Sequence, residues 1–301
     1  MTRLDLPLAR RALGAICGAL LLAGCATANP EPSAGSAVDP KMIQTALAQA
    51  DQALARGDLA NARKGYRRIL AVAPSTPTAQ LGLGEVELSA GDPRRALDQF
   101  KAAAADPALR PGALQGQGLA LIRLGRPEAA EPILKETVTL DPGLWRAWNA
   151  LGSIEDSRRN WAGADEAYRQ ALANNPDSAL VLNNMGLSRL LRRDYQQAEQ
   201  IFAKALAADP ALEGAANNLR IAQAWQGRYQ EALQGVDEAR LPQRLNDVGY
   251  VAMLRGDLAV AETLFLRAIS ASPTYHEVAQ KNLQEVERRK TIGTPVPAVF
   301  K

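Results

Sequence analysis

Apolar and small residues recur along this chain at a fixed spacing. Seven alanines are separated by 34 residues, except for a last interval of 29, and a bulky apolar residue follows each alanine by four positions. Four residues make about one turn of an α-helix, so each alanine shares a helix face with its bulky partner. A fixed period of this length predicts a protein built from stacked helical repeats. The alanines are Ala62, Ala96, Ala130, Ala164, Ala198, Ala232 and Ala261, and the bulky residues are Tyr66, Phe100, Leu134, Tyr168, Phe202, Val236 and Phe265.

A small residue stands twelve positions before the alanine in six of the seven copies. Small side chains at this slot let two helices approach closely. The sixth copy has Arg220 there and is also shortened, so we expect its packing to be looser or locally bent. The small residues are Ala50, Gly84, Gly118, Gly152, Gly186 and Gly249.

The fourth and fifth copies carry the fullest sequence signature. Its residues are Trp148, Leu151, Gly152, Ala164, Tyr168, Ala171 and Pro176 in the fourth copy, and Leu182, Met185, Gly186, Ala198, Phe202, Ala205 and Pro210 in the fifth. This pattern resembles the tetratricopeptide repeat, a 34-residue helix–turn–helix unit, over residues 41–274. The resemblance implies an all-α fold, a right-handed solenoid of about seven repeats whose units stack because none buries its apolar face alone.

The family usually places a glycine in the turn between the two helices of a unit. Five copies follow this rule, whereas Arg159 and Arg193 take the place of glycine in the two central copies. A dipeptide ending in proline stops several second helices, because proline cannot continue a helix and restricts the residue before it. The turn glycines are Gly57, Gly91, Gly125, Gly227 and Gly256, and the prolines are Pro107, Pro142, Pro176, Pro210 and Pro273.

The end of a repeat stack needs a cap with a polar outer face. Residues 275–290 predict such a capping helix, with Val278, Leu283 and Val286 facing the last repeat and charged residues elsewhere. After it, glycine and prolines break any helix, so residues 291–301 are expected to form a flexible tail.

The N-terminus predicts export and lipid attachment. Three arginines precede an apolar run of a dozen residues from Ala12 to Ala23, which is too short to cross a bilayer. The sequence Leu22-Ala23-Gly24-Cys25 resembles a bacterial lipobox. That resemblance implies that residues 1–24 are a lipoprotein signal peptide and that Cys25 is the lipid-attachment residue. The alternatives are an ordinary secretory signal, with Cys25 there by chance, and a short buried helix.

Residues 25–40 read as the lipidated cysteine and a flexible linker rich in Ala, Pro and Ser. The fifteen residues after Cys25 would span roughly 20 Å as a coil and up to about 50 Å when stretched. Residue 26 is alanine instead of aspartate, which by resemblance to enterobacterial lipoproteins implies an outer-membrane lipoprotein facing the periplasm of the cell envelope.

Charge and chemistry exclude several functions. The chain has 35 basic and 32 acidic residues, and removal of residues 1–24 leaves 32 and 31, too balanced for phosphate-backbone binding. We therefore expect no nucleic-acid partner. The single histidine, His276, has no recognisable catalytic or metal-binding companions, and carboxylates such as Asp156 read as a solvated helix face. The sequence predicts no enzyme, no metal, no cofactor and no small-molecule substrate.

Asparagines recur at one position of the first helix of each unit. In the family, positions 2, 5, 6, 9, 12 and 13 of the unit line a concave groove, and asparagine ladders there bind extended peptides. Because an amide both donates and accepts, such a column can pair with a peptide backbone whatever its sequence. The alternative is that these amides satisfy their neighbours in the stack. Position 5 holds Asn149, Asn183, Asn217 and Asn246, and position 6 holds Asn184 and Asn218.

Apolar residues occupy the other groove positions toward the C-terminus. An apolar stripe rimmed by polar residues often marks a protein-binding site. The alternative is that these residues pack internally or on the cap. If they bind a partner, replacing Trp225 and Leu190 with aspartate removes capture without unfolding the stack. The apolar residues are Leu187, Leu190, Leu191, Ile221, Trp225, Tyr250, Met253 and Leu254.

A lipobox, a short linker and a repeat stack together resemble the lipoproteins of tight-adherence (Flp/Tad) pilus assembly. Asn246-Asp247-Val248-Gly249-Tyr250 in the last repeat carries part of this resemblance. It implies a membrane-anchored scaffold that binds a secretin or another pilus-assembly protein, as a pilotin does. Two other classes stay open: an adaptor lipoprotein that docks peptidoglycan hydrolases, and a soluble regulatory subunit of an enzyme, in which Cys25 is not lipidated.

Overall fold

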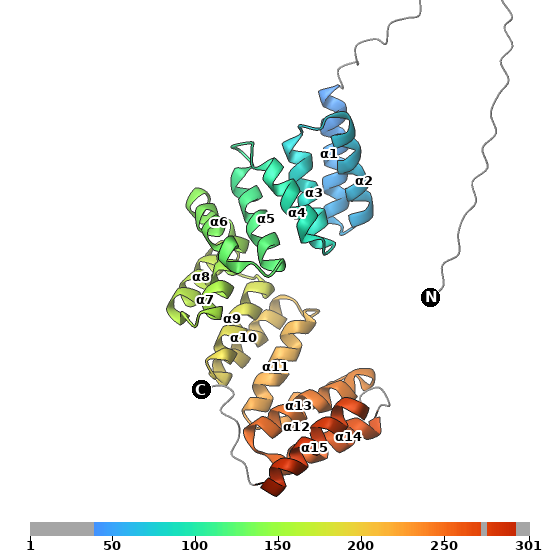
Figure 1. Ribbon diagram of the computed structural model, residues 1–301, viewed down its shortest axis with the longest axis vertical. Helices are drawn as coiled ribbons and strands as arrows, with labels where there is room; N and C mark the ends of the chain where they lie inside the picture. Colours follow the sequence, from blue (N-terminus) through green and yellow to red (C-terminus); the bar gives the residue numbers. More distant parts are fainter. Residues whose placement is uncertain (1–38, 272–275, 293–301) are drawn as a thin grey trace, which may run out of the picture. The chain divides into compact units, whose positions relative to one another are not determined.

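The computed structural model describes residues 39–271 and 276–292, which form helices joined by short turns. The helices pack as consecutive pairs, and the first helix of each pair also contacts the first helix of the next pair (Figure 1). The predicted signal peptide, Cys25, most of the linker and the tail after residue 292 lie outside the described residues. The pairs are α1 (Pro40–Ala55) and α2 (Leu59–Val72), α3 (Pro77–Ser89) and α4 (Pro93–Ala103), α5 (Arg110–Arg123) and α6 (Pro127–Leu140), α7 (Trp145–Ser157) and α8 (Trp161–Asn174), α9 (Ala179–Leu191) and α10 (Tyr195–Ala208), α11 (Glu213–Trp225) and α12 (Tyr229–Leu233), and α13 (Leu241–Arg255) and α14 (Leu258–Ala271), followed by α15 (His276–Ile292).

This arrangement confirms the predicted all-α solenoid of seven helix–turn–helix repeats with a C-terminal capping helix. None of the helices in the described residues combines the length and the apolar character that a bilayer crossing needs.

The repeated alanines and their bulky partners form the core. All seven alanines are fully buried, and so are six of the seven bulky residues. The exception is Val236, which is only half buried and lies outside any helix. Burying a large apolar side chain contributes about 1.5–3 kcal/mol. The same pair of side chains in each repeat therefore supplies much of the packing energy of the stack.

The small slot exists because the bulky residue of the second helix lies directly over it. A Cβ atom built at Gly152 would be 2.6 Å from the ring of Tyr168, and one at Gly186 would be 2.5 Å from the ring of Phe202. Gly84 has the same relation to Phe100. Real Cβ atoms do not approach ring carbons this closely, so a larger residue at the slot would push the two helices of a pair apart.

The turns between paired helices require a left-handed residue. Gly57, with φ of 74°, and Gly91, with φ of 82°, fill this position, and Arg159 and Arg193 adopt it with φ of 58° and 63°. The predicted turn site is confirmed, including the two copies in which arginine replaces glycine. A residue with a side chain costs about 1–2 kcal/mol in this conformation.

The sixth repeat departs from the others, as its sequence predicts. Helix α12 has only five residues, and Gly235 with φ of 65° follows its extended end residue Gln234. A left-handed glycine at this place commonly ends a helix. The chain then makes a short 3₁₀ turn, η1 (Glu238–Arg240), before α13. Because the second helix is lost after one turn, Val236 does not reach the place that the bulky residue occupies in other repeats.

The capping helix covers the last repeat, although with a different set of residues than expected. Val286 is fully buried beside Met253 and Phe265, and Leu283 packs against the same cluster. The prediction for Val278 is wrong, because its side chain is 48% exposed and the neighbouring Ala279 is buried instead. A one-residue shift rotates the side chain by about 100° around a helix, which is enough to exchange the two.

We predict that Gly186→Ala destabilises the stack. Its new methyl group would lie 2.5 Å from Cε1 of Phe202, and overpacking of this kind costs about 1–3 kcal/mol. The melting temperature followed by circular dichroism should fall. Gly214→Ala is the matched control, because a Cβ at Gly214 in α11 meets nothing within 4 Å. Equal melting temperatures for the two variants would contradict the close contact.

We also predict opposite responses to two substitutions at Arg159. This residue is exposed and has φ of 58°. Arg159→Val should lower the free energy of unfolding by about 1–2 kcal/mol, because a β-branched residue tolerates this backbone least. Arg159→Gly should be neutral or stabilising. Chemical denaturation of both variants checks the difference, and a valine variant as stable as the glycine variant would argue against a left-handed turn.

Candidate functional site

The candidate binding residues lie on four first helices, α7, α9, α11 and α13, that contact one another in sequence. We call these four helices the first-helix row. The fold brings together positions that are about a hundred residues apart in the chain. The structure then decides which of these side chains are committed to the stack and which remain accessible.

The asparagine column forms hydrogen bonds from one repeat to the next. Nδ2 of Asn184 donates to Oδ1 of Asn149 at 3.1 Å, and Nδ2 of Asn218 donates to Oδ1 of Asn183 at 2.9 Å. Asn149 and Asn183 are buried. Their amide oxygens are thus occupied within the stack, which is the arrangement that the alternative interpretation expects. Asn217 is half buried, and its side chain bonds to no residue within the described ranges.

The column continues into the capping helix, where sequence reasoning missed it. Nδ2 of Asn282 on α15 donates to Oδ1 of the buried Asn246 at 2.8 Å. The bonded partners are 35 residues apart in the two earlier rungs and 36 apart here. A search for asparagine 35 or 36 residues after each member of the column would have found Asn282. The amide pairing thus ties the cap to the seventh repeat as it ties the repeats to each other.

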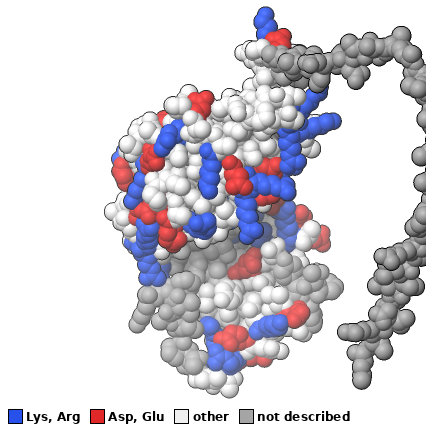
Figure 2. Space-filling view, turned by 45° about the horizontal axis from the view of Figure 1, so that its top comes forward, with Lys and Arg blue, Asp and Glu red and all other residues white. Residues whose placement is uncertain are grey.

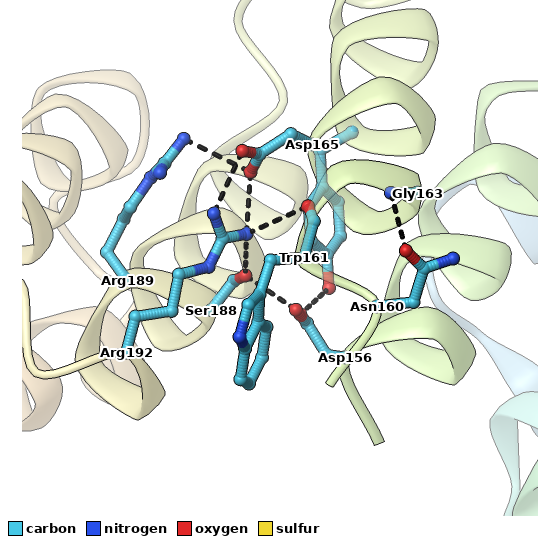
Figure 3. A network of polar contacts seen from close by, with 9 residues as sticks. Asp156, Asn160, Trp161, Gly163, Asp165, Ser188, Arg189 and Arg192 are labelled. Atoms are coloured by element: carbon cyan, nitrogen blue, oxygen red, sulfur yellow. Dashed lines mark hydrogen bonds and ion pairs between the residues drawn. The ribbon is translucent and has the colours of Figure 1, made fainter. Parts of the chain in front are cut away.

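A buried carboxylate links the fourth and fifth repeats. Asp156 on α7 accepts a hydrogen bond from the hydroxyl of Tyr168 at 2.8 Å. It accepts another from the hydroxyl of Ser188 at 2.6 Å (Figure 3). The interpretation of Asp156 as part of a solvated face is wrong, because its side chain is buried. A buried carboxylate is tolerated when hydrogen bonds replace its water, and here two hydroxyls do so.

Arginines from α9 extend this network to α8. Arg192 donates to both carboxylate oxygens of Asp165 at 2.6 and 2.9 Å, and its guanidinium lies 5.1 Å above the ring of Trp161 (Figure 3). Arg189 donates to the same carboxylate at 3.1 Å. The bonds from Arg192 hold the pKa of Asp165 below its ordinary value. Trp161 therefore packs within the protein, and the two central repeats are joined by charge as well as by apolar contact.

Most of the predicted apolar stripe is used for packing. The ring of Trp225 stacks on Tyr195, with 5.3 Å between centroids and planes 4° apart. Ile221 and Trp225 pack against a cluster that includes Leu245, and Leu187 and Leu190 pack against the cluster around Phe202. Met253 is only 2% exposed and contacts Phe265 in the core beneath the cap.

These contacts change the expected result of replacing Trp225 and Leu190 with aspartate. Both side chains are half buried and packed, so aspartate at either place would destabilise the stack as well as any complex. The accessible apolar residues of the set are Leu191, which is 60% exposed on α9, and Tyr250, which is 46% exposed on α13. Leu254 is half buried.

The sixth repeat has an arginine on α11, the first helix that lies between those of Leu191 and Tyr250 in the row. Arg220 on α11 is half buried, and its Nη1 donates to the carbonyl of Ala216 at 3.2 Å. It has no acidic partner among the described residues. Burial lowers the pKa of Arg220, and the nearby Arg244 lowers it further. Arg244 instead pairs with Asp247 at 3.1 Å. The row thus carries an unneutralised cation at α11.

Two further features bear on function. A cavity of 1030 Å³ lies beside the shortened α12 and is lined by residues that include Tyr229, Leu233 and Val260. Sequence reasoning missed this cavity, although the short sixth copy was its signal.

Within the described ranges, no group of three or more His, Cys, Asp or Glu side chains is placed to hold a metal ion.

Comparisons with known proteins agree with the architecture. The family model described as tetratricopeptide repeat matches residues 47–113, 115–179 and 149–213. The uncharacterized protein y4yS of Sinorhizobium fredii is 33% identical over 122 residues, which are 38% of this chain and 66% of that protein. The chain thus spans just under two thirds of the length of this relative.

Two solved structures share the fold at low sequence identity. A tetratricopeptide repeat protein from Parabacteroides merdae is 16% identical with a TM-score of 0.53, over 82% of this chain and 99% of that one. PilF of Pseudomonas aeruginosa is 20% identical with a TM-score of 0.50, over 83% and 98%.

The family model covers more than half of the 301 residues, and the observed helix pairs repeat with the period of its unit. The chain belongs to the tetratricopeptide repeat family.

Proposed function

We propose that this protein is a membrane-anchored, non-catalytic scaffold that binds a segment of a partner protein along the first-helix row. One observation carries the proposal: the row is locked internally by amide and carboxylate bonds, yet it leaves Leu191 and Tyr250 exposed. Aromatic and large apolar side chains on a rigid surface are the usual anchors of protein interfaces. The unpaired Arg220 adds a place for an acidic group of the partner.

We propose Cys25 as the lipid-attachment residue and the periplasmic face of the outer membrane as the location. The support is the lipobox-like sequence Leu22-Ala23-Gly24-Cys25 after a charged and apolar leader. Several acyl chains on one residue give stable anchoring, whereas a single chain is marginal. The linker after Cys25 would hold the first repeat within about 50 Å of the bilayer.

The proposed process is assembly of a tight-adherence (Flp/Tad) pilus, with a secretin or another pilus-assembly component as the partner. Its support is the resemblance of the last repeat, in particular Asn246 to Tyr250, together with the lipobox and the repeat stack. An adaptor that docks peptidoglycan hydrolases would share the anchor and the first-helix row. The identity of the captured protein separates the two functions.

We predict that affinity capture from detergent-solubilised envelope brings down a secretin or pilus component. With Cys25→Ser, the protein and its partner should leave the outer-membrane fraction, because the variant has no thiol to acylate. Mass spectrometry of the captured proteins checks both points. Recovery of peptidoglycan hydrolases would replace pilus assembly with the adaptor function. An unchanged soluble location of both forms would overturn the lipoprotein assignment.

We predict that Leu191→Asp combined with Tyr250→Asp weakens partner capture by on the order of 30-fold, the loss expected when two interface anchors that together contribute about 2 kcal/mol are removed. The melting temperature should barely change, because exposed substitutions usually cost less than about 0.5 kcal/mol. Leu266→Asp is the control, since Leu266 is 51% exposed but lies on the second helix α14. Equal capture by the control and the double variant would place the interface elsewhere.

A further inference from the structure

The second helices differ in charge along the stack. Helix α2 carries Arg63, Lys64, Arg67 and Arg68 and no acidic residue. Helix α4 carries three basic residues and one acidic residue. In α6 the sign reverses, because Glu128, Glu131 and Glu136 outnumber its single lysine. The nearly neutral composition of the chain therefore hides an excess of basic residues on the second helices of the first two repeats.

Two of the α2 cations are used inside the protein and two are not. Arg63 and Arg67 both bind the buried carboxylate of Glu87 on α3, each at 3.0 Å. Lys64 and Arg68 are exposed one helical turn apart and form no ion pair or hydrogen bond with any described residue. Figure 2 shows Lys and Arg side chains, with Asp and Glu among them, on the right-hand flank of the upper part of the view.

Helix α4 of the next repeat carries further exposed cations on either side of the exposed Asp98. Arg94 and Lys101 are exposed and likewise have no bonded partner in the part of the chain that the structure describes. We call Lys64, Arg68, Arg94 and Lys101 the basic face. Fixed positive charges without internal partners attract an anionic surface over roughly the Debye length, about 8–10 Å at physiological salt.

An apolar edge adjoins the basic face. Val72 lies one turn beyond Arg68 on α2 and is 55% exposed, and Met42 near the start of α1 is 66% exposed. The two helices are joined by a tight turn at Gly57, so the start of α1 and the end of α2 lie at the same end of the pair. Basic residues beside exposed apolar ones are typical of surfaces that rest in the headgroup region of a bilayer.

We propose that the basic face rests on anionic phospholipid headgroups of the membrane that holds the anchor. This inference depends on the proposed acylation of Cys25, because a linker of fifteen residues confines the first repeat to within about 50 Å of the bilayer. Each basic residue near an anionic leaflet contributes about 1 kcal/mol, which is a factor of about five in population. Contact through α2 and α4 keeps the first-helix row of the later repeats free for a partner.

The test uses the full acylated chain reconstituted into vesicles of phosphatidylcholine alone or with one third phosphatidylglycerol. Flotation first shows whether the chain is anchored, and acetylation of lysines followed by mass spectrometry then maps the contact. Lys64 should be protected in the anionic vesicles at low salt and become reactive at high salt. Lys204, which is exposed on α10, is the internal control and should react equally in all samples.

Variants separate charge from nonspecific effects. Arg68→Gln with Arg94→Gln should lower the ratio of protected to unprotected Lys64 roughly 25-fold, from two factors of about five. Arg159→Gln with Arg267→Gln removes the same charge from exposed positions elsewhere and should leave protection unchanged. Flotation with equal reactivity of Lys64 in both vesicles would overturn this inference and leave the anchor intact. Failure to float would overturn the anchor itself. If an added acidic protein protects Lys64 and the vesicles do not, anionic lipid is not the ligand of the basic face.

Discussion

The contact between a glycine on one helix and a bulky side chain on the next determines the spacing of this stack. The ring of Phe100 lies against Gly84 of its own repeat and also against Gly116 of the following repeat. One side chain therefore fixes both the distance within a pair and the distance between neighbouring pairs. The contact within a pair recurs at Gly118, Gly152, Gly186 and Gly249. Stacking of such pairs covers apolar surface that one helix pair cannot bury alone.

The sixth repeat shows what happens where the contact is missing. Arg220 occupies the small slot, and Val236 has no helix to carry it over that slot. The second helix ends after one turn, and a cavity opens beside it. Aromatic packing between Tyr195 and Trp225 supports the stack on the other side of this repeat. The irregular repeat thus lacks the glycine–bulky contact, has the Tyr195–Trp225 stack instead, and leaves the cation of Arg220 on the first-helix row.

The polar groups of the row explain how it can be both rigid and available. Amide oxygens in the row accept hydrogen bonds from the next repeat, at Asn149 and Asn183, or from the cap, at Asn246. The carboxylate of Asp156 accepts hydrogen bonds from two hydroxyls. Hydrogen bonds between buried polar groups on different helices restrict the relative positions of those helices. The exposed Leu191 and Tyr250 therefore stand on a preorganised surface, which reduces the entropy lost when a partner binds.

The sequence by itself determined the repeat, its period, the core alanines and their bulky partners, the turn sites at Arg159 and Arg193, and the irregular sixth unit. These features depend on local periodicity and backbone preference, which one sequence records directly. It did not determine that Leu191 is exposed whereas Trp225 and Met253 pack against neighbouring helices. Nor did it determine that Ala279, and not Val278, is the buried residue of the capping helix. Those outcomes depend on which neighbouring helix covers each face and at what rotation, and only the packing of complete repeats decides that. For the same reason the asparagine column appeared in the sequence as a pattern, while its hydrogen bonds to the next repeat became visible only in the tertiary structure.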